Sequence, residues 1–265
     1  MVSLETRRKT PGRSSWALFS ALGFLALYAL SNLTPFGQRA ENLLLDGTTD
    51  QTLIYEVYRT GFLPALSLEY ETMAVGIGAA VLIAAWRRRW RDLATVIVAT
   101  PVAVYSTRIF KDAAPRPDLV GAVHGLTERS YPSGHFAVAA AVSVALLIVV
   151  PRTWLRWVAP VLLSWTSAVG GAVLTMMWHR PSDVLGGALL VAAVFLLAGA
   201  VLSKTTEERE KVWRPSVPVV VVGIGITVAS AWRDPYTWTV PFSVVTAVLA
   251  TAFLGYVALR CRTES

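Results

Sequence analysis

Cysteine and charged side chains are both scarce in this sequence. The single cysteine, Cys261, lies near the C-terminus, so no intrachain disulfide is possible and no thiol-metal cluster can form. Asp, Glu, Lys and Arg make up 15% of the chain, whereas about a quarter is usual in soluble domains. The composition therefore excludes an ordinary soluble domain.

Hydrophobic residues are abundant instead, at 54% of the 265 residues, and the mean hydropathy is +0.53. A membrane-spanning helix needs roughly 20 mainly apolar residues, and several runs of about this length lie between charged or Pro-rich segments. The sequence therefore predicts an all-α fold, a polytopic transmembrane helix bundle with both termini on one side. The predicted spans are 16–33, 69–86, 93–109, 133–150, 158–178, 183–202, 216–232 and 238–259.

The net charge of +7 raises the possibility of a nucleic-acid partner. Most of the Lys and Arg residues, however, fall in the segments that are cytoplasmic if the N-terminus is cytoplasmic, and most acidic residues fall in the others. This is the distribution of a membrane protein, and it forms no continuous basic stripe with interleaved aromatics. We therefore expect no nucleic acid as a partner.

The spans divide the chain into a cytoplasmic segment (1–15), a membrane core (16–203), a cytoplasmic loop (204–215), two additional spans (216–259) and a cytoplasmic tail (260–265). The first span also resembles a signal peptide, with a possible cleavage site at Ala29-Leu30-Ser31, but a retained span is favoured. In the long outer segment that follows it, Leu53, Ile54, Val57 and Tyr58 predict an amphipathic helix that lies in the interface or packs on the bundle.

Polar residues of chemical interest follow the third span. Lys111 and Arg116-Pro117 come first, and Pro132-Ser133-Gly134-His135 then opens directly into an apolar helix. The first N–H groups of a helix have no partners within it, and the helix dipole adds positive potential there. Ser133 and Gly134 allow phosphate oxygens to approach closely. The pattern predicts an anion site to which Lys111 and Arg116 add charge, although both cations are also compatible with headgroup anchoring.

A second polar group, His179-Arg180-Pro181-Ser182-Asp183, lies between the fifth and sixth spans on the same outer side. His135 and His179 are therefore expected at the same depth, where they can meet. A phosphohydrolase needs a nucleophile, a group that orients it, an acid for the leaving oxygen and donors for the transferred charge. The two segments supply all four, while helix capping alone would explain Asp183 but not His179.

These motifs resemble the PAP2 (type 2 phosphatidic acid phosphatase) superfamily from about Lys111 to Leu190. The resemblance implies a six-helix core in the first six spans, with the last two as an extension. It implies that His179 is the nucleophile that forms a phosphohistidine, that Asp183 orients it, and that His135 protonates the leaving oxygen. It also implies phosphate binding by Lys111, Arg116, Ser133, Gly134 and Arg180, with no metal and no cofactor.

Two departures from the family pattern are visible. The first motif usually has six residues between its Lys and its Arg-Pro, but four separate Lys111 from Arg116, and the expected lysine position is Ile109. The third motif usually carries an Arg six residues before the nucleophile, where this chain has Val173. One phosphate-binding cation is therefore missing, which weakens the site or is compensated by Arg108, Arg129 or Arg180.

The resulting hypothesis is an integral membrane lipid phosphate phosphatase with its site on the extracytoplasmic face of a bacterial cell membrane. Its partners would be membrane lipids and a lipid phosphate substrate, such as a polyprenyl phosphate or diphosphate, phosphatidic acid or phosphatidylglycerol phosphate. The sequence leaves the oligomeric state open. Alternatives are a non-catalytic protein of this fold that binds or transports lipid phosphates, a generic transporter, and a vanadate-dependent haloperoxidase.

Overall fold

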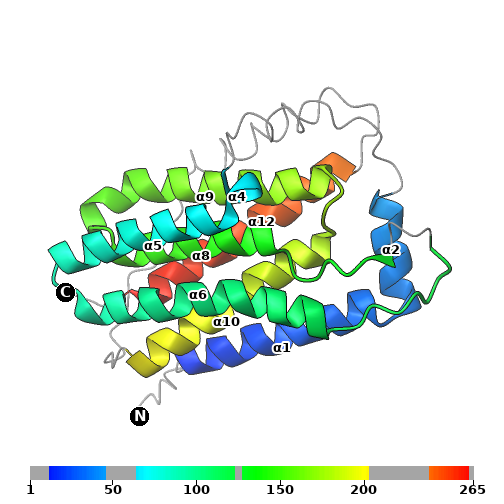
Figure 1. The fold of residues 1–265 in the computed structure, drawn as a ribbon, viewed down its shortest axis with the longest axis horizontal. Coiled ribbons are helices and arrows are strands. Elements are labelled where there is room, and N and C mark those ends of the chain that lie inside the picture. Colours follow the sequence, from blue (N-terminus) through cyan, green and yellow to red (C-terminus); the bar gives the residue numbers. More distant parts are fainter. Residues whose placement is uncertain (1–11, 46–63, 123–126, 203–238, 263–265) are drawn as a thin grey trace, which may run out of the picture.

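The structure is a computed structural model that describes residues 12–45, 64–122, 127–202 and 239–262. All regular elements in these ranges are helices, as the sequence predicts, and most of them lie nearly parallel in one elongated bundle (Figure 1). Their bounds are α1 (Arg13–Asn32), α2 (Pro35–Leu45), α4 (Pro64–Ser67), α5 (Glu69–Trp86), α6 (Trp90–Ala113), α8 (Gly134–Val149), α9 (Arg152–Thr175), α10 (Pro181–Leu202) and α12 (Thr239–Cys261).

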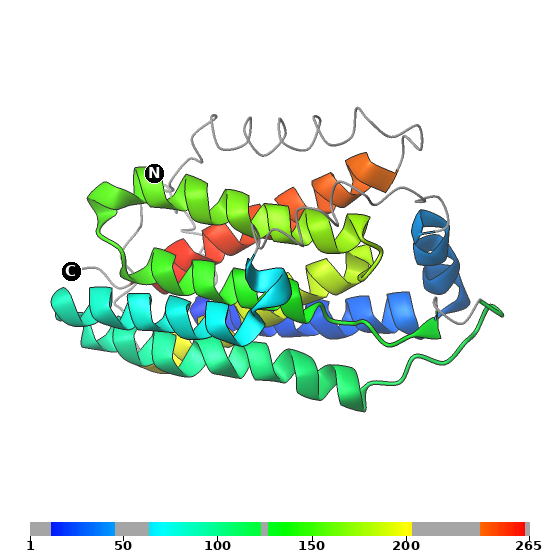
Figure 2. The same ribbon diagram turned by 45° about the horizontal axis from the view of Figure 1, so that its top comes forward.

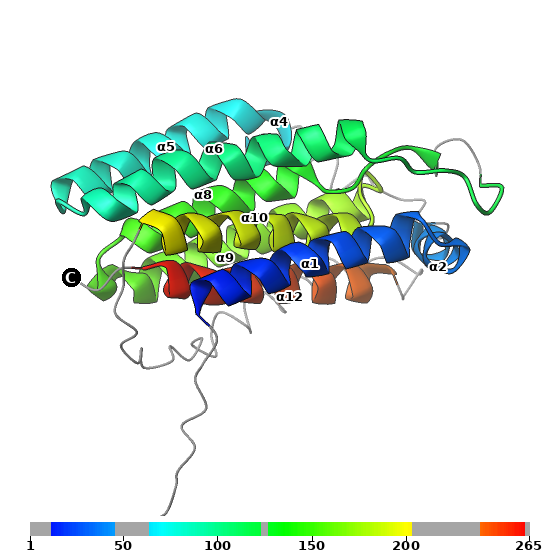
Figure 3. The same ribbon diagram turned by 90° about the horizontal axis from the view of Figure 1, so that it is seen from below.

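Helix α8 forms the centre of the bundle. It packs against α5, α6, α9, α10 and α12, and nearly every side chain along it is buried. Figure 3 shows α5 and α6 on one side of this centre, with α1 and α12 on the other, and Figure 2 shows α9 and α12 on the side away from α5 and α6. The many alanines of α8 let these neighbours approach closely, because small side chains keep helix axes near each other in a membrane bundle. At one contact, a Cβ on Gly76 of α5 would lie 2.5 Å from the Val142 side chain of α8.

The outward faces of the bundle are apolar. Among the described helices, α1, α6, α9 and α10 are long and apolar enough to cross a membrane, and Gly134–Val149 and Val245–Cys261 are shorter apolar helices. Large hydrophobic side chains such as Leu22 on α1, Val102 on α6 and Val201 on α10 are exposed. A soluble protein rarely exposes such surfaces, so they indicate contact with lipid.

The observed helices match seven of the eight predicted spans and depart from some of them at the ends. Helix α6 begins before and ends after the predicted 93–109, and α9 occupies 152–175 where 158–178 is predicted. Helix α12 corresponds to the eighth span. The seventh span and the helix predicted around Leu53 to Tyr58 lie outside the described residues, whereas α2 forms earlier in that outer segment.

Tyr131 connects the loop before α8 to the rest of the bundle. Its hydroxyl donates to the carbonyl of Phe24 in α1 at 2.7 Å, and its ring packs near those of Phe24, Tyr28 and Phe110. Burial raises the pKa of Tyr131, so the hydroxyl remains a neutral donor. A Cβ on Gly186 of α10 would come within 2.5 Å of this ring, so the glycine is required for the loop to lie against α10.

Candidate active site

The predicted motifs meet at one end of the bundle, where α8 and α10 both begin. This end, called the site end below, is the end at which α2 crosses the other helices (Figure 1). Ser133 caps α8, because its hydroxyl accepts a hydrogen bond from the Phe136 N–H at 3.3 Å. The Ser133 N–H in turn donates to the carbonyl of Asp183 at 3.0 Å. The two helix starts are therefore joined directly through their main chains.

A tight turn between α9 and α10 delivers His179 to the same place. The Met177 N–H donates to the Leu174 carbonyl and the Trp178 N–H donates to the Val173 carbonyl, which is the Schellman pattern of a helix C-terminus. Met177 takes the left-handed conformation, φ 57°, that glycine usually occupies in this pattern. The His179 N–H also donates to the Val173 carbonyl, at 3.1 Å. The turn thus fixes the main chain of His179.

His179 and Asp183 form a buried pair. The His179 Nδ1 and the Asp183 Oδ2 lie 3.2 Å apart, and the Asp183 side chain is fully buried. The same Oδ2 accepts a hydrogen bond from the Arg180 N–H at 2.8 Å, which fixes the carboxylate. A carboxylate at Nδ1 selects the tautomer in which Nε2 carries the lone pair. The arrangement can therefore present His179 Nε2 as a nucleophile.

His135 lies beside His179, as the two motifs predict. The centroids of the two imidazole rings are 5.9 Å apart, and the exposed Trp178 ring is 5.4 Å from that of His135. The Nε2 of His135 is 3.3 Å from Oε1 of Glu69, the first residue of α5. Its Nδ1 is buried and has no hydrogen-bond partner among the described residues. His135 therefore has one nitrogen held by a carboxylate and one available to a ligand.

Comparison with known proteins agrees with this geometry. Residues 94–207 match the family model of the PAP2 superfamily. This segment belongs to the PAP2 superfamily. No curated protein and no solved structure was found to match the chain. The family indicates a phosphatase or related phosphoesterase activity, and together with the apolar helices it indicates an integral membrane protein.

The position of the missing PAP2 arginine is part of the core. Val173 is completely buried in α9, and its carbonyl holds the turn that precedes His179. Two of the cations considered as replacements have other partners. Arg108 contacts Glu69 at 2.6 Å, and Arg129 donates to the carbonyl of Asp112 at 3.0 Å. Arg180 is buried and donates to the Ser130 hydroxyl, and its N–H donates to Asp183, so of the three it is the one beside the His179–Asp183 pair.

The two cations of the first PAP2 motif both reach this end of the bundle. Lys111, in the last turn of α6, is half-buried and interacts electrostatically with Asp183 and Glu69. Arg116 is buried and donates from Nη1 to Asn32 Oδ1 at 2.6 Å, while its Nη2 has no partner among the described residues. Burial and the nearby Arg180 lower the pKa of Arg116. The guanidinium group of Arg116 therefore keeps a donor available for an anion.

Gly134 leaves space beside the start of α8. A Cβ built on Gly134 would lie 3.6 Å from Glu69 Oε1 and 4.0 Å from Thr107 Oγ1, which are ordinary contacts. Packing within the protein therefore does not require a glycine here. The open approach to the helix N-terminus is what a phosphate group needs to reach the N–H groups.

Two carboxylates at the PAP2 site were not identified from the sequence. Glu69 is the first residue of the predicted span 69–86. A charged residue at the start of a span was the signal that could have identified it. Glu41, in α2, accepts a hydrogen bond from the Ser182 N–H at 3.1 Å and lies close enough to Asp183 to interact with it. Burial and Asp183 raise the pKa of Glu41 to about 7. No motif surrounds Glu41, and α2 lies outside the matched segment.

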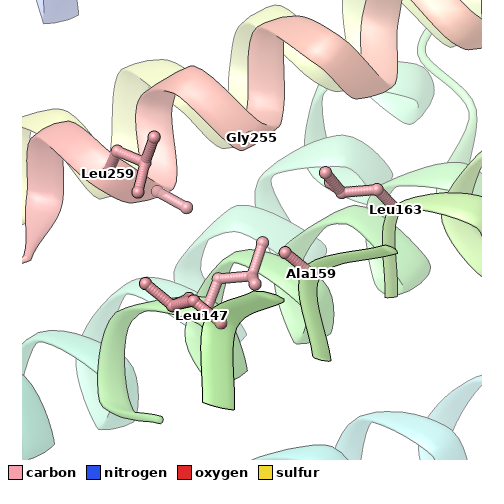
Figure 4. A pocket seen from close by; sticks show the side chains of 7 residues that line it. Leu147, Ala159, Leu163, Gly255 and Leu259 are labelled. Atoms are coloured by element: carbon pink, nitrogen blue, oxygen red, sulfur yellow. The ribbon is translucent and has the colours of Figure 1, made fainter. Parts of the chain in front are cut away.

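Two further observations bear on the chemistry. Among the described residues, no group of three or more His, Cys, Asp and Glu side chains could hold a metal ion. A separate hollow lies between α8, α9 and α12 and has an apolar lining that offers no group for phosphate chemistry (Figure 4). It is lined by Leu147, Leu155, Ala159, Leu163, Gly255, Ala258 and Leu259.

Proposed function

We propose that this protein is a lipid phosphate phosphatase that hydrolyses a phosphate monoester or diphosphate through a phosphohistidine, without a metal. The observation that carries the proposal is the juxtaposition of two histidines with different partners. His179 is paired with the buried Asp183 at 3.2 Å, and the His135 ring lies 5.9 Å from that of His179. One histidine is oriented as a nucleophile, and its neighbour has a buried nitrogen without a hydrogen-bond partner among the described residues.

In the first step, His179 Nε2 attacks the phosphorus atom and the bond from phosphorus to the leaving oxygen breaks. A proton from His135 passes to that oxygen and neutralises the charge that develops on it. The lipid then leaves as an alcohol or as a monophosphate. Lys111, Arg116, Arg180 and the N–H groups at the start of α8 stabilise the charge on the transferred phosphoryl group. The site thereby combines covalent catalysis with electrostatic stabilisation.

In the second step, water attacks the phosphohistidine and His135 accepts a proton from that water. The nitrogen–phosphorus bond breaks, inorganic phosphate is released, and His179 and His135 return to their starting states. Each step moves one proton and one phosphoryl group, so neither requires a redox partner.

A lipid substrate is supported by the position of the site at the end of an apolar bundle. The exposed hydrophobic surfaces of α1, α6 and α10 favour acyl or prenyl chains beside the helices. A headgroup at the level of the helix starts could then reach His179 while its tail stays in the bilayer. From the distribution of charged residues in the sequence, we propose that this end faces the extracytoplasmic side.

The test uses protein purified in detergent and a panel of polyprenyl phosphates, polyprenyl diphosphates, phosphatidic acid and phosphatidylglycerol phosphate. We expect phosphate release from at least one lipid, inhibition by vanadate, and a labelled phosphoprotein that survives an alkaline quench. His179→Ala should abolish both release and labelling, and His135→Ala should slow release strongly. His124→Ala, which changes the remaining histidine of the chain, is the control.

Phosphate release that His179→Ala leaves intact would exclude the phosphohistidine mechanism. Lipid phosphate binding without any release would instead support the non-catalytic alternative. That alternative is favoured by one observation, the replacement of the family's third-motif arginine by the buried Val173.

A further inference from the structure

Glu69 contacts the proposed acid from a helix outside the matched family segment. We propose that Glu69 is a positioning residue that orients His135 and favours the doubly protonated form needed to protonate the leaving oxygen. This inference rests on the proposed function, because it assigns a partner to the acid of that reaction. Glu69 and His135 then form a second histidine–carboxylate pair, next to that of Asp183 and His179.

The geometry fixes the Glu69 carboxylate from two sides. Oε1 is 3.3 Å from His135 Nε2, and Oε2 is 2.6 Å from Arg108 Nη2. The Arg108 guanidinium also lies over the Tyr70 ring, 4.5 Å from its centroid. With one oxygen bound to each partner, the carboxylate has a defined orientation toward the imidazole.

The unoccupied nitrogen of His135 determines what this contact can do. Because Nε2 faces Glu69, the nitrogen left for substrate is Nδ1, which is buried and has no partner among the described residues. To donate from Nδ1 while Nε2–H remains bound to the carboxylate, the ring must carry protons on both nitrogens. A carboxylate at Nε2 stabilises that cationic ring, and after transfer it holds the neutral ring with Nδ1 ready to accept a proton from water.

Burial, and after it the other charged groups around His135, oppose protonation of this ring. Lys111 and Arg108 on α6 are cations, and His179 on the turn before α10 also acts against a positive charge on the His135 ring. Among the described groups that act on His135, Glu69 supplies the compensating negative charge. Protonation of His135, the proposed acid, therefore depends on Glu69. The proposed nucleophile, His179, has its own carboxylate partner in Asp183.

The experiment compares Glu69→Gln with Glu71→Gln, a matched control on the exposed side of the same first helical turn. Each variant is assayed with two phosphate monoesters that share an alkyl tail, one with an alkoxide and one with a nitrophenoxide leaving group. We expect Glu69→Gln to slow release from the alkyl ester by about 10- to 100-fold. The aryl ester should lose much less, because a weakly basic leaving group needs little protonation.

The pH profile supplies a readout that a merely structural role would not move. In Glu69→Gln, the alkaline limb of the rate profile for the alkyl ester should shift to lower pH, because the cationic ring has lost its carboxylate. Glu69→Asp, which keeps the charge, should leave the limb near its original position. In a double-mutant cycle, Glu69→Gln should have little further effect in the His135→Ala background.

Equal losses for the two esters with an unmoved alkaline limb would overturn the assignment of Glu69. So would additive effects of Glu69→Gln and His135→Ala. These results are distinct from failure of the proposed function, which appears as phosphate release that survives His179→Ala. Should Glu69→Gln fail to fold, the same comparison of esters in Glu69→Ala, which also removes the carboxylate, decides the question.

Discussion

The two ends of the bundle use charged side chains in opposite ways. At the end opposite the site, α8, α10 and α12 finish, and their last carbonyl groups carry partial negative charge. Arg87 donates to the carbonyl of Val149 at 2.8 Å, and Arg262 donates to those of Leu147 and Val150. These guanidinium groups are committed to helix termini and hold the bundle together.

At the site end, the buried polar groups are incompletely satisfied. Arg116 Nη2, Glu41 Oε2, His135 Nδ1 and Asp183 Oδ1 are buried and have no hydrogen-bond partner among the described residues. Leaving such atoms unpaired destabilises a fold, and they persist mainly where a ligand or water completes them. We interpret the difference as one end that stabilises the fold and one that binds a ligand, in line with the proposed function, and four substitutions test this interpretation.

The largest expected effect is at the nucleophile pair. Asp183→Asn keeps the shape of the side chain but removes the charge that selects the His179 tautomer, so phosphate release should fall by about 10³- to 10⁴-fold. The thermal unfolding temperature in detergent should change little by comparison. A loss of activity below tenfold would show that Asp183 serves the fold and not the chemistry, which would break the contrast between the ends.

The opposite end should respond in stability. Arg262→Ala removes the donor of the Leu147 carbonyl and leaves the Val150 carbonyl with only the 3.4 Å contact from Arg87 Nη1. We expect it to cost about 2–4 kcal/mol and lower Tm by on the order of 10 °C. Phosphate release per folded molecule should stay unchanged. Arg91→Ala, at an exposed arginine of the same end, is the control and should shift Tm very little. A loss of specific activity in Arg262→Ala would contradict the division of roles.

Glu41 should make stability depend on pH. Its pKa is raised from 4.5 to about 7 in the fold, so the folded state binds a proton more tightly than the unfolded state. Stability should therefore be greatest below about pH 4.5 and fall as pH rises to about 7, by up to about 3 kcal/mol. Glu41→Gln should remove this slope and raise Tm above pH 7. Thermal unfolding between pH 4.5 and 8 measures both, and an unchanged slope would exclude Glu41 as its source.

The smallest expected effect is at the turn before His179. Met177 occupies a left-handed conformation that is strained for any residue with a Cβ, so Met177→Gly should stabilise the fold by up to about 1 kcal/mol. Arg156→Gly, at an exposed position inside α9, should instead destabilise it by about the same amount. Thermal unfolding of the two variants gives the comparison. A Met177→Gly variant that unfolds earlier would show that side-chain contacts of Met177 outweigh the backbone strain.

The helices and the histidine pair were largely predictable from sequence, for a physical reason. Apolar runs of spanning length identify α1, α5, α6, α8, α9 and α10. His179 stands four residues before Asp183 in the sequence, and the turn that leads into α10 is short enough to keep the two side chains together. The predicted span ends at residue 178, whereas α9 ends at Thr175. The difference arises because Met177 occupies the position of the glycine that normally marks such a turn. The contacts of Glu41 and Glu69 were not predictable, since they depend on how distant helices pack.

The proposed role of Glu69 has a consequence for how such proteins can diversify. Glu69 belongs to α5, which precedes the 94–207 segment, yet it touches a residue of the best-recognised motif inside that segment. Exchange of the N-terminal helices between relatives would leave every motif intact and still alter the acid. Working pH and preference among leaving groups could therefore drift during evolution while the recognisable signature stays constant, and motif comparison alone would register no change.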